Sequence, residues 1–115
     1  MVEPDDYYQR LFRASLGQLV ELQVLRRGRE AEQSIQKSAP DALVMEMLLP
    51  DQSGYQLLQK IRKEPERQSL PIIIFSRVGS LEDVEASFAY GVAGYFVKGQ
   101  DSVHDVKKLI LSLVQ

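Results

Sequence analysis

An apolar run in the middle of the sequence constrains the fold more than any other stretch. From Ala42 to Leu49 every residue is apolar except Glu46, and the run ends in Pro50-Asp51-Gln52-Ser53-Gly54, a turn-forming sequence. Such a run is typical of a strand buried on both faces, as found in parallel sheets with helices on both sides. A buried carboxylate is costly unless it has a partner or faces a cleft. Glu46 is therefore the first candidate functional residue.

Composition excludes several classes of function. The 115 residues suit a single domain, which we take as residues 1–115. There is no cysteine and one histidine, which excludes thiolate metal sites and disulfides and argues against a histidine-based zinc site. The net charge of −2 gives no basic bias toward nucleic acid. No apolar run approaches the roughly 20 residues of a membrane span, and no secretory signal is visible, so we expect a cytoplasmic domain.

Strand-like and helix-like segments alternate along the chain. Strands are expected at residues 1–3, 20–25, 42–49, 70–75 and 94–97, and helices at 8–16, 29–38, 54–63, 81–90 and 103–114. This alternation with short connections predicts an α/β fold with a doubly wound parallel sheet. In the helix at 81–90, Val84 and Phe88 are expected to face inward. Residues 1–3 resemble only the end of a strand, so we expect a truncated first strand. Either residues upstream of Met1 or altered packing, such as a swapped homodimer, would then cover the core.

Polar residues stand at the ends of the expected strands. The first ends in Glu3 and is followed by Asp5 and Asp6, Glu46 lies near the end of the third, and Ser76 and Lys98 end the fourth and fifth. In a parallel sheet these ends meet at one edge, where a cleft forms. Lysine can neutralise a phosphoryl oxygen, a hydroxyl can donate to one, and carboxylates can hold a hard cation. The arrangement therefore suits an anion or a metal–phosphate unit.

Three motifs carry a resemblance to a known family. PDALVMEMLLPDQSG at 40–54, PIIIFSR at 71–77 and GVAGYFVKG at 91–99 resemble the receiver domain of response regulators, the phospho-switch of two-component signalling. The resemblance extends from Val2 to Val114. It implies a flavodoxin-like, five-stranded parallel sheet in the order 2-1-3-4-5 with helices on both faces. It also implies a signalling module that is not itself an enzyme, with a histidine kinase as a partner.

The resemblance also assigns roles to individual residues. Glu46 falls on the aspartate that accepts the phosphoryl group, and Ser76 and Lys98 fall on the residues that contact phosphoryl oxygens. Tyr95 falls on the aromatic residue that rotates when the switch is active. The two acids that hold Mg²⁺ fall on Glu3 with Pro4 or Asp5.

Departures from the family pattern predict a pseudo-receiver. Glu46 places its carboxylate one methylene further out than an aspartate would, and Pro4 cannot ligate a metal through its side chain. Gly99 replaces the proline that usually follows the lysine, so the cis peptide bond found there is not expected. We therefore expect a domain that is not phosphorylated in the usual way and binds a protein partner. The expected surface is the helix at 81–90, the strand at 95–97 and the helix at 103–114.

Three alternatives remain open at this point. Glu46 is either a structural acid paired with Lys98 or a longer acid that imitates the phosphorylated state. A working phosphorelay receiver would instead use Glu46 with a metal held by Glu3 and Asp5. A flavodoxin-like enzyme or cofactor binder is the third alternative, but the sequence has no glycine-rich phosphate loop after the first strand and no nucleophile with a base.

Overall fold

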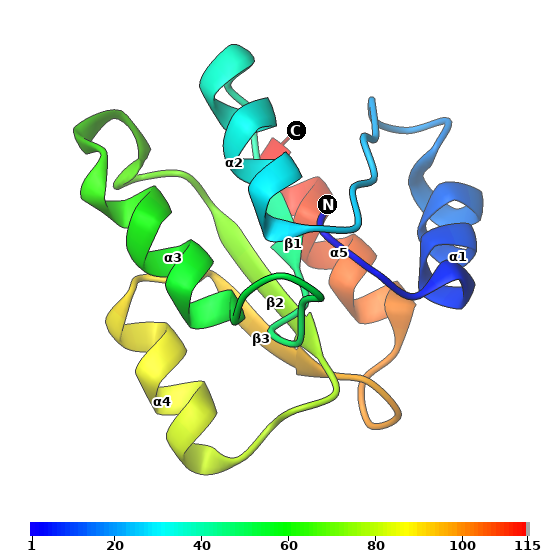
Figure 1. Ribbon diagram of the computed structural model, residues 1–115. Coiled ribbons are helices and arrows are strands. Elements are labelled where there is room, and N and C mark those ends of the chain that lie inside the picture. The colour runs from blue at the N-terminus through cyan, green and yellow to red at the C-terminus, as the bar shows by residue number, and fades with distance from the viewer. Residues whose placement is uncertain (115) are drawn as a thin grey trace.

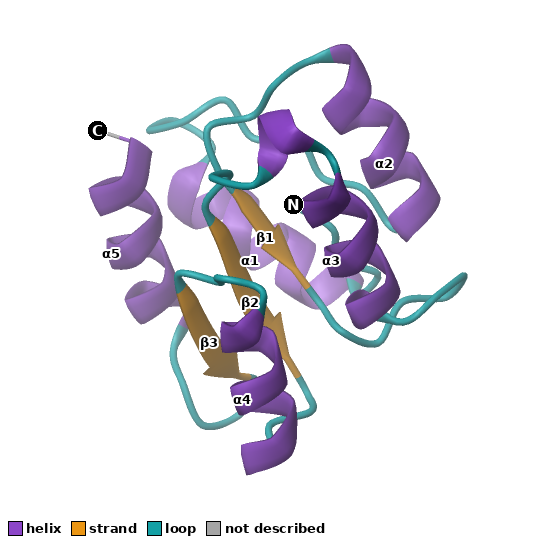
Figure 2. Ribbon diagram, turned by 90° about the vertical axis from the view of Figure 1, so that its left-hand side faces the viewer, coloured by secondary structure: helices purple, strands orange, loops and turns teal. Residues whose placement is uncertain are grey.

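The computed structural model describes residues 1–114, which form a three-stranded parallel sheet between two layers of helices. In chain order the elements are α1 (Asp6–Leu16), α2 (Gly28–Lys37), β1 (Leu43–Met45), α3 (Gly54–Lys63), the 3₁₀ helix η1 (Pro65–Arg67), β2 (Ile72–Ser76), α4 (Leu81–Ala89), β3 (Gly94–Val97) and α5 (Val103–Val114). The strand order is β1-β2-β3, and all pairs are parallel. α1 and α5 lie together on one side of the sheet, and α2, α3 and α4 lie on the other (Figure 1, Figure 2).

The two faces of β2 bury separate hydrophobic clusters because its side chains alternate between them. Ile72 and Ile74 pack with the buried residues of α2 and α3, whereas Ile73 and Phe75 pack with those of α1 and α5. All five residues of β2 are buried, as expected for the central strand of a sheet covered on both sides. The α/β fold with a parallel sheet is thus confirmed. None of the helices within residues 1–114 combines the length and apolar character needed to cross a membrane.

Local signals in the sequence set the helix boundaries. Asp5 caps α1 by accepting a hydrogen bond from the Tyr7 N–H, and Ser53 and Gln56 form a capping box at the start of α3. α2 is capped in part from outside. The Asp51 carboxylate, in the loop after β1, accepts from the N–H groups of Gly28 at 2.9 Å and Arg29 at 3.0 Å. This contact joins the loop after β1 to the N-terminus of α2.

The expected strands at 20–25 and at 1–3 are each reduced to a single bridging residue, Leu25 and Val2. Val2 forms single parallel bridges to Leu25 and to Met45. Upstream of Leu25, Val20 and Leu22 line a cavity of about 490 Å³ instead of pairing with a neighbouring strand. Alternating apolar residues form a strand only where a second backbone satisfies their N–H and C=O groups. Residues 1–114 thus contain three strands where five were expected.

Three further differences concern burial and length. β1 ends at Met45 and does not reach Leu49, because the Glu46 carboxylate accepts the N–H groups of the next two residues and the chain bends. Phe88 does not face inward: it is 49% exposed, and Ser87 is the buried residue of α4. β3 is half-buried because it is the edge strand of the sheet.

Candidate functional site

The side chain of Glu46 is 2% exposed and surrounded by donors. Its Oε2 accepts from the backbone N–H of Met47 at 2.6 Å, from that of Leu48 at 3.1 Å and from the Ser76 hydroxyl. Its Oε1 accepts from the Lys98 ammonium at 3.0 Å and from the Arg77 N–H at 3.3 Å. Both carboxylate oxygens are therefore engaged by the protein itself.

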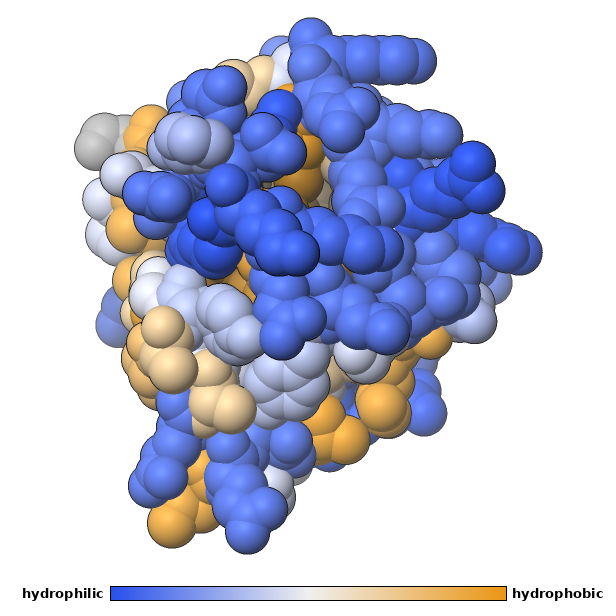
Figure 3. Space-filling model, turned by 60° about the vertical axis from the view of Figure 1, so that its left-hand side comes forward, coloured by the Kyte–Doolittle hydropathy of each residue, from blue (hydrophilic) through white to orange (hydrophobic). Residues whose placement is uncertain are grey.

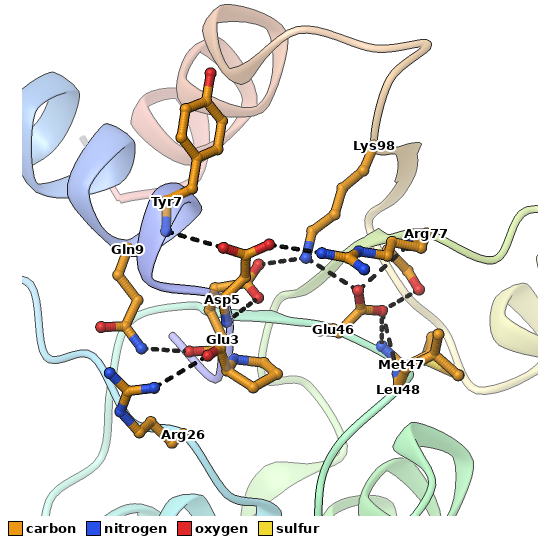
Figure 4. A network of polar contacts seen from close by, with 12 residues as sticks. Glu3, Asp5, Tyr7, Gln9, Arg26, Glu46, Met47, Leu48, Arg77 and Lys98 are labelled. Atoms are coloured by element: carbon orange, nitrogen blue, oxygen red, sulfur yellow. Dashed lines mark hydrogen bonds and ion pairs between the residues drawn. The ribbon is translucent and has the colours of Figure 1, made fainter.

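Lys98 joins Glu46 to a second buried acid. The Lys98 Nζ lies 2.7 Å from Glu3 Oε1 and 3.0 Å from Glu46 Oε1, and the side chains of Lys98 and Glu3 are 3% and 1% exposed. Figure 4 shows Lys98 reaching between the two carboxylates. On its other side the ammonium lies 4.5 Å from the ring centre of Tyr8 and 5.6 Å from that of Phe75. The charged end of Lys98 is thus enclosed by two acids and two aromatic rings.

A more exposed ion pair lies beside this buried group. Arg77 Nη2 is 2.7 Å from Asp5 Oδ2, and the arginine side chain is 63% exposed. The other oxygen of Asp5 accepts the Tyr7 N–H at 2.9 Å as the cap of α1. Arg77 therefore connects the end of β2 to the start of α1 across the edge of the sheet where the site lies (Figure 4).

The two buried acids differ in their electrostatics. Burial raises the pKa of Glu46, but hydrogen bonds from Ser76, Lys98 and Leu48 outweigh burial, so the pKa of Glu46 lies below its usual value. For Glu3, burial prevails over the hydrogen bond from Lys98, and the pKa of Glu3 is raised. As the pH falls, Glu3 therefore takes up a proton before Glu46.

Tyr95 lies close to this group without joining it. Its hydroxyl donates to the Val78 carbonyl oxygen in the loop after β2, and its side chain is partly buried. Burial is the main reason why the pKa of Tyr95 is raised to about 12. Gly99, next to Lys98, has a φ of +87°, a conformation that glycine adopts easily, and no cis peptide bond occurs within residues 1–114.

The donor set does not fit the Mg²⁺ ion that the family resemblance implies. Each carboxylate oxygen of Glu3, Asp5 and Glu46 already accepts from an N–H, O–H or ammonium group of the protein. Mg²⁺ requires oxygen ligands at about 2.0–2.1 Å in an octahedron. Within residues 1–114, no group of three or more acidic or histidine side chains is arranged to hold a metal.

The structure brings together most of the residues singled out from the sequence. Glu3, Glu46, Ser76 and Lys98 form one hydrogen-bonded group, and Asp5 adjoins it through Arg77. Sequence reasoning gave no role to Arg77 or to Tyr8. Arg77 directly follows Ser76 at the end of β2, which is a signal that could have pointed to it. Tyr8 reaches the site from α1, and no sequence signal marks this approach.

Comparisons with known proteins agree with this geometry. The sequence model of the response regulator receiver domain matches residues 1–110. The phosphate regulon transcriptional regulatory protein PhoB of Rhizobium meliloti is 33% identical over 99 residues, covering 85% of this chain and 44% of PhoB. The chain thus spans less than half the length of that relative.

Solved structures of a response regulator and of a receiver domain superpose on this chain over almost its whole length. A putative response regulator from Chloroflexus aurantiacus superposes with a TM-score of 0.84 at 30% identity, covering 99% of this chain and 94% of the other. The BeF3-activated N-terminal receiver domain of RstA from Klebsiella pneumoniae superposes with a TM-score of 0.82 at 27% identity, covering 99% and 96%.

Proposed function

The chain belongs to the family of response regulator receiver domains, which act in two-component signalling, and we propose that it signals by binding a protein partner without ordinary phosphorylation. Receiver domains are generally signalling modules without an enzymatic activity of their own. They interact with histidine kinases and other proteins. The proposal concerns how this particular domain does so.

One observation carries the proposal: the carboxylate at the acceptor position is buried and saturated with donors. A nucleophilic carboxylate needs an oxygen that a phosphodonor can approach. Glu46 is 2% exposed, and its two oxygens together accept five hydrogen bonds. Ser76 and Lys98, the groups that the family uses for phosphoryl oxygens, are among the donors. This arrangement supports a pseudo-receiver.

The same contacts support a fixed, active-like state. In the family, the hydroxyl of the Ser76 position contacts a phosphoryl oxygen, and the aromatic residue of the Tyr95 position rotates between an outward and an inward position. Here the Ser76 hydroxyl donates to Glu46 without any phosphoryl group, and Tyr95 is partly buried with its hydroxyl bound to Val78. We infer that the longer arm of Glu46 takes the place of the phosphorylated acid.

The proposed docking surface consists of α4, β3 and α5. On α4, Leu81 is 73% exposed and Phe88 is 49% exposed. Figure 3 shows several separate apolar residues in the lower part of the molecule, set among hydrophilic ones, below a largely hydrophilic upper part. Leu81 and Phe88 are seven residues apart and therefore lie on the same face of α4, which is why we propose this helix as part of the docking surface. A Phe88→Ser variant should therefore lose partner binding while the fold is kept.

We also propose the five-strand order 2-1-3-4-5 for this domain. The bridges of Val2 to Leu25 and to Met45 support it, because they place residue 2 between the segment that contains Leu25 and β1. Hydrogen–deuterium exchange should show protection of the Glu3 N–H, which donates to the Leu25 carbonyl at 2.8 Å, and of the Leu25 N–H. Exchange of both amides at the rate of an open chain would refute the order.

The decisive experiment exposes the protein to acetyl phosphate and Mg²⁺ and measures its intact mass. We expect no added phosphoryl group in the natural protein. We also expect none in Glu46→Asp, because Glu3 and Asp5 stay paired with Lys98 and Arg77. An added phosphoryl mass that disappears in Glu46→Gln would instead favour a working phosphorelay receiver. Phosphorylation of Glu46→Asp alone would show that only the length of the side chain prevents the reaction.

A further inference from the structure

Two side-chain cations lie where the three acids of the site converge. Lys98 bridges Glu3 Oε1 at 2.7 Å and Glu46 Oε1 at 3.0 Å. Arg77 binds Asp5 Oδ2 through its guanidinium at 2.7 Å and Glu46 Oε1 through its backbone N–H at 3.3 Å. Each acid therefore has one oxygen directed at a cationic side chain.

We propose that Lys98 and Arg77 together replace a divalent cation in this site, so that the domain holds its acidic edge together without metal. This inference rests on the proposed function, because it explains how the acidic edge is neutralised when no phosphoryl chemistry takes place. Arg77 is the new element: with Lys98 alone, Asp5 would have no cationic partner. Arg77 acts as a positioning residue that fixes Asp5 and closes the edge of the site.

Charge and geometry both support the replacement. Three carboxylates and two cations leave a local charge of −1, so a divalent ion would find little excess negative charge to neutralise. It would also have to displace donors from carboxylate oxygens that are all engaged, including the ammonium of a lysine that is 3% exposed. The three oxygens that face Lys98 and Arg77 come from three different acids; carboxylate oxygen is the ligand type that a hard cation prefers, but within residues 1–114 these acids are arranged around the two cationic side chains and not around a metal position.

The two cations are unequal in accessibility, and this makes the proposal testable. Lys98 is enclosed by Tyr8 and Phe75, whereas the Arg77 side chain is 63% exposed. Arg77→Ala should therefore leave the fold intact while it frees Asp5 Oδ2. Adding Lys98→Met frees the facing oxygens of Glu3 and Glu46 as well and removes the second positive charge.

The experiment measures binding of Mn²⁺ by the loss of the free-ion electron paramagnetic resonance signal at neutral pH. We expect the natural protein to bind most weakly, Arg77→Ala about threefold more tightly, and the Arg77→Ala/Lys98→Met variant at least about tenfold more tightly. Arg26→Ala is the matched control, because Arg26 pairs with the exposed Asp6, the first residue of α1, instead of with an acid of the site. It removes the same charge and should bind Mn²⁺ like the natural protein.

Several outcomes would overturn the proposal. Equal affinity of the natural protein and the double variant would mean that the two cations do not occupy the ion's place. An equal gain in Mn²⁺ affinity in Arg26→Ala and Arg77→Ala would mean that only the change in net charge matters. If the double variant does not fold, the comparison of Arg77→Ala with the natural protein decides, and no gain there refutes the proposal.

The outcome is separable from that of the proposed function. A natural protein that binds Mn²⁺ tightly but accepts no phosphoryl group would end this inference and leave the proposed function standing. A natural protein that is phosphorylated with no metal present would refute the proposed function and leave this inference standing.

Discussion

Replacing Lys98 by methionine tests the buried group on which the site depends. Methionine keeps most of the apolar stem that packs near Tyr8 and Phe75, but it removes the ammonium that Glu3 and Glu46 share. Both carboxylates would then lie buried without their counter-charge. Removing one partner of a buried ion pair costs about 3–5 kcal/mol, because an uncompensated charge remains in the interior. A domain of this size has a total stability of roughly 5–15 kcal/mol, so the loss is a large part of it.

The loss of stability in Lys98→Met should depend on pH, because Glu3 and Glu46 can each take up a proton. In the variant, burial is no longer opposed by Lys98, so the folded-state pKa of Glu3 rises further above its usual value and the folded-state pKa of Glu46 rises from its lowered value. Acids whose folded pKa is raised destabilise the protein above that pKa, and the penalty disappears as the pH falls toward the unfolded value. The difference between natural protein and variant should therefore be largest at neutral pH and narrow toward pH of about 5.

Urea unfolding followed by far-ultraviolet circular dichroism measures the effect. We expect the midpoint to fall by roughly 1–3 M urea at neutral pH with an unchanged slope. Lys60→Met is the control, because Lys60 forms a half-exposed pair with Glu32 at 3.3 Å and should change stability by less than about 1 kcal/mol. A loss below about 1 kcal/mol in Lys98→Met at neutral pH would refute the buried group and, with it, the function assigned to Glu46.

Three further predictions concern other residues. Glu46→Ala should lower the free energy of unfolding by about 1–3 kcal/mol, which is less than Lys98→Met, because Lys98 keeps its pair with Glu3. If Glu46 imitates a phosphorylated acid, the same variant should bind the partner more weakly. Unchanged partner binding would make Glu46 a structural acid only. Asp51→Ala should cost about 1 kcal/mol of stability by uncapping α2. Despite partial desolvation, the N–H groups of Arg29 and Gly28 lower the pKa of Asp51, so the difference in urea midpoint between natural protein and variant should shrink below pH of about 3. The same difference at that pH and at neutral pH would contradict this. Because burial raises the pKa of Tyr95 to about 12, absorbance titration should show a tyrosine ionising near that pH, and stability should fall as the pH rises from about 10 to about 12. Tyr95→Phe should remove this ionisation and its share of the loss of stability, while Tyr55, whose pKa is also raised by burial, remains.

The helices could be predicted from the sequence because their signals are local. Asp5, the capping box of Ser53 with Gln56, and Ser80 each lie directly before the helix that they cap. Whether residues 20–25 form a strand, as expected, or only the single bridge at Leu25 could not be decided from local signals. A strand requires hydrogen bonds to another segment, and its own alternation of apolar residues does not reveal whether that segment is present. The inward position of Phe88 failed for a related reason, since the face that α4 buries depends on the packing of the whole helix.

The residues of the site that lie at strand ends could be predicted, because the topology of the sheet brings those ends together. Parallel strands end at one edge, so Glu3, Glu46, Ser76 and Lys98 could be expected to meet there. Arg77 and Tyr8 contribute through long side chains that reach the site from a loop and from α1. Their direction depends on rotamers and neighbours, which the spacing of residues along the chain does not encode.

The stability of this site and its lack of an accessible nucleophile have the same physical cause. The extra methylene of Glu46 brings its carboxylate within reach of the Ser76 hydroxyl, the Lys98 ammonium and two backbone N–H groups at once. Donors of this kind would stabilise the charge of a transferred phosphoryl group, and here they stabilise the carboxylate itself, which lowers its pKa despite its burial. Under the proposed function, an anion held in this way would be a weaker nucleophile, and the contacts that favour the folded state would also oppose phosphorylation.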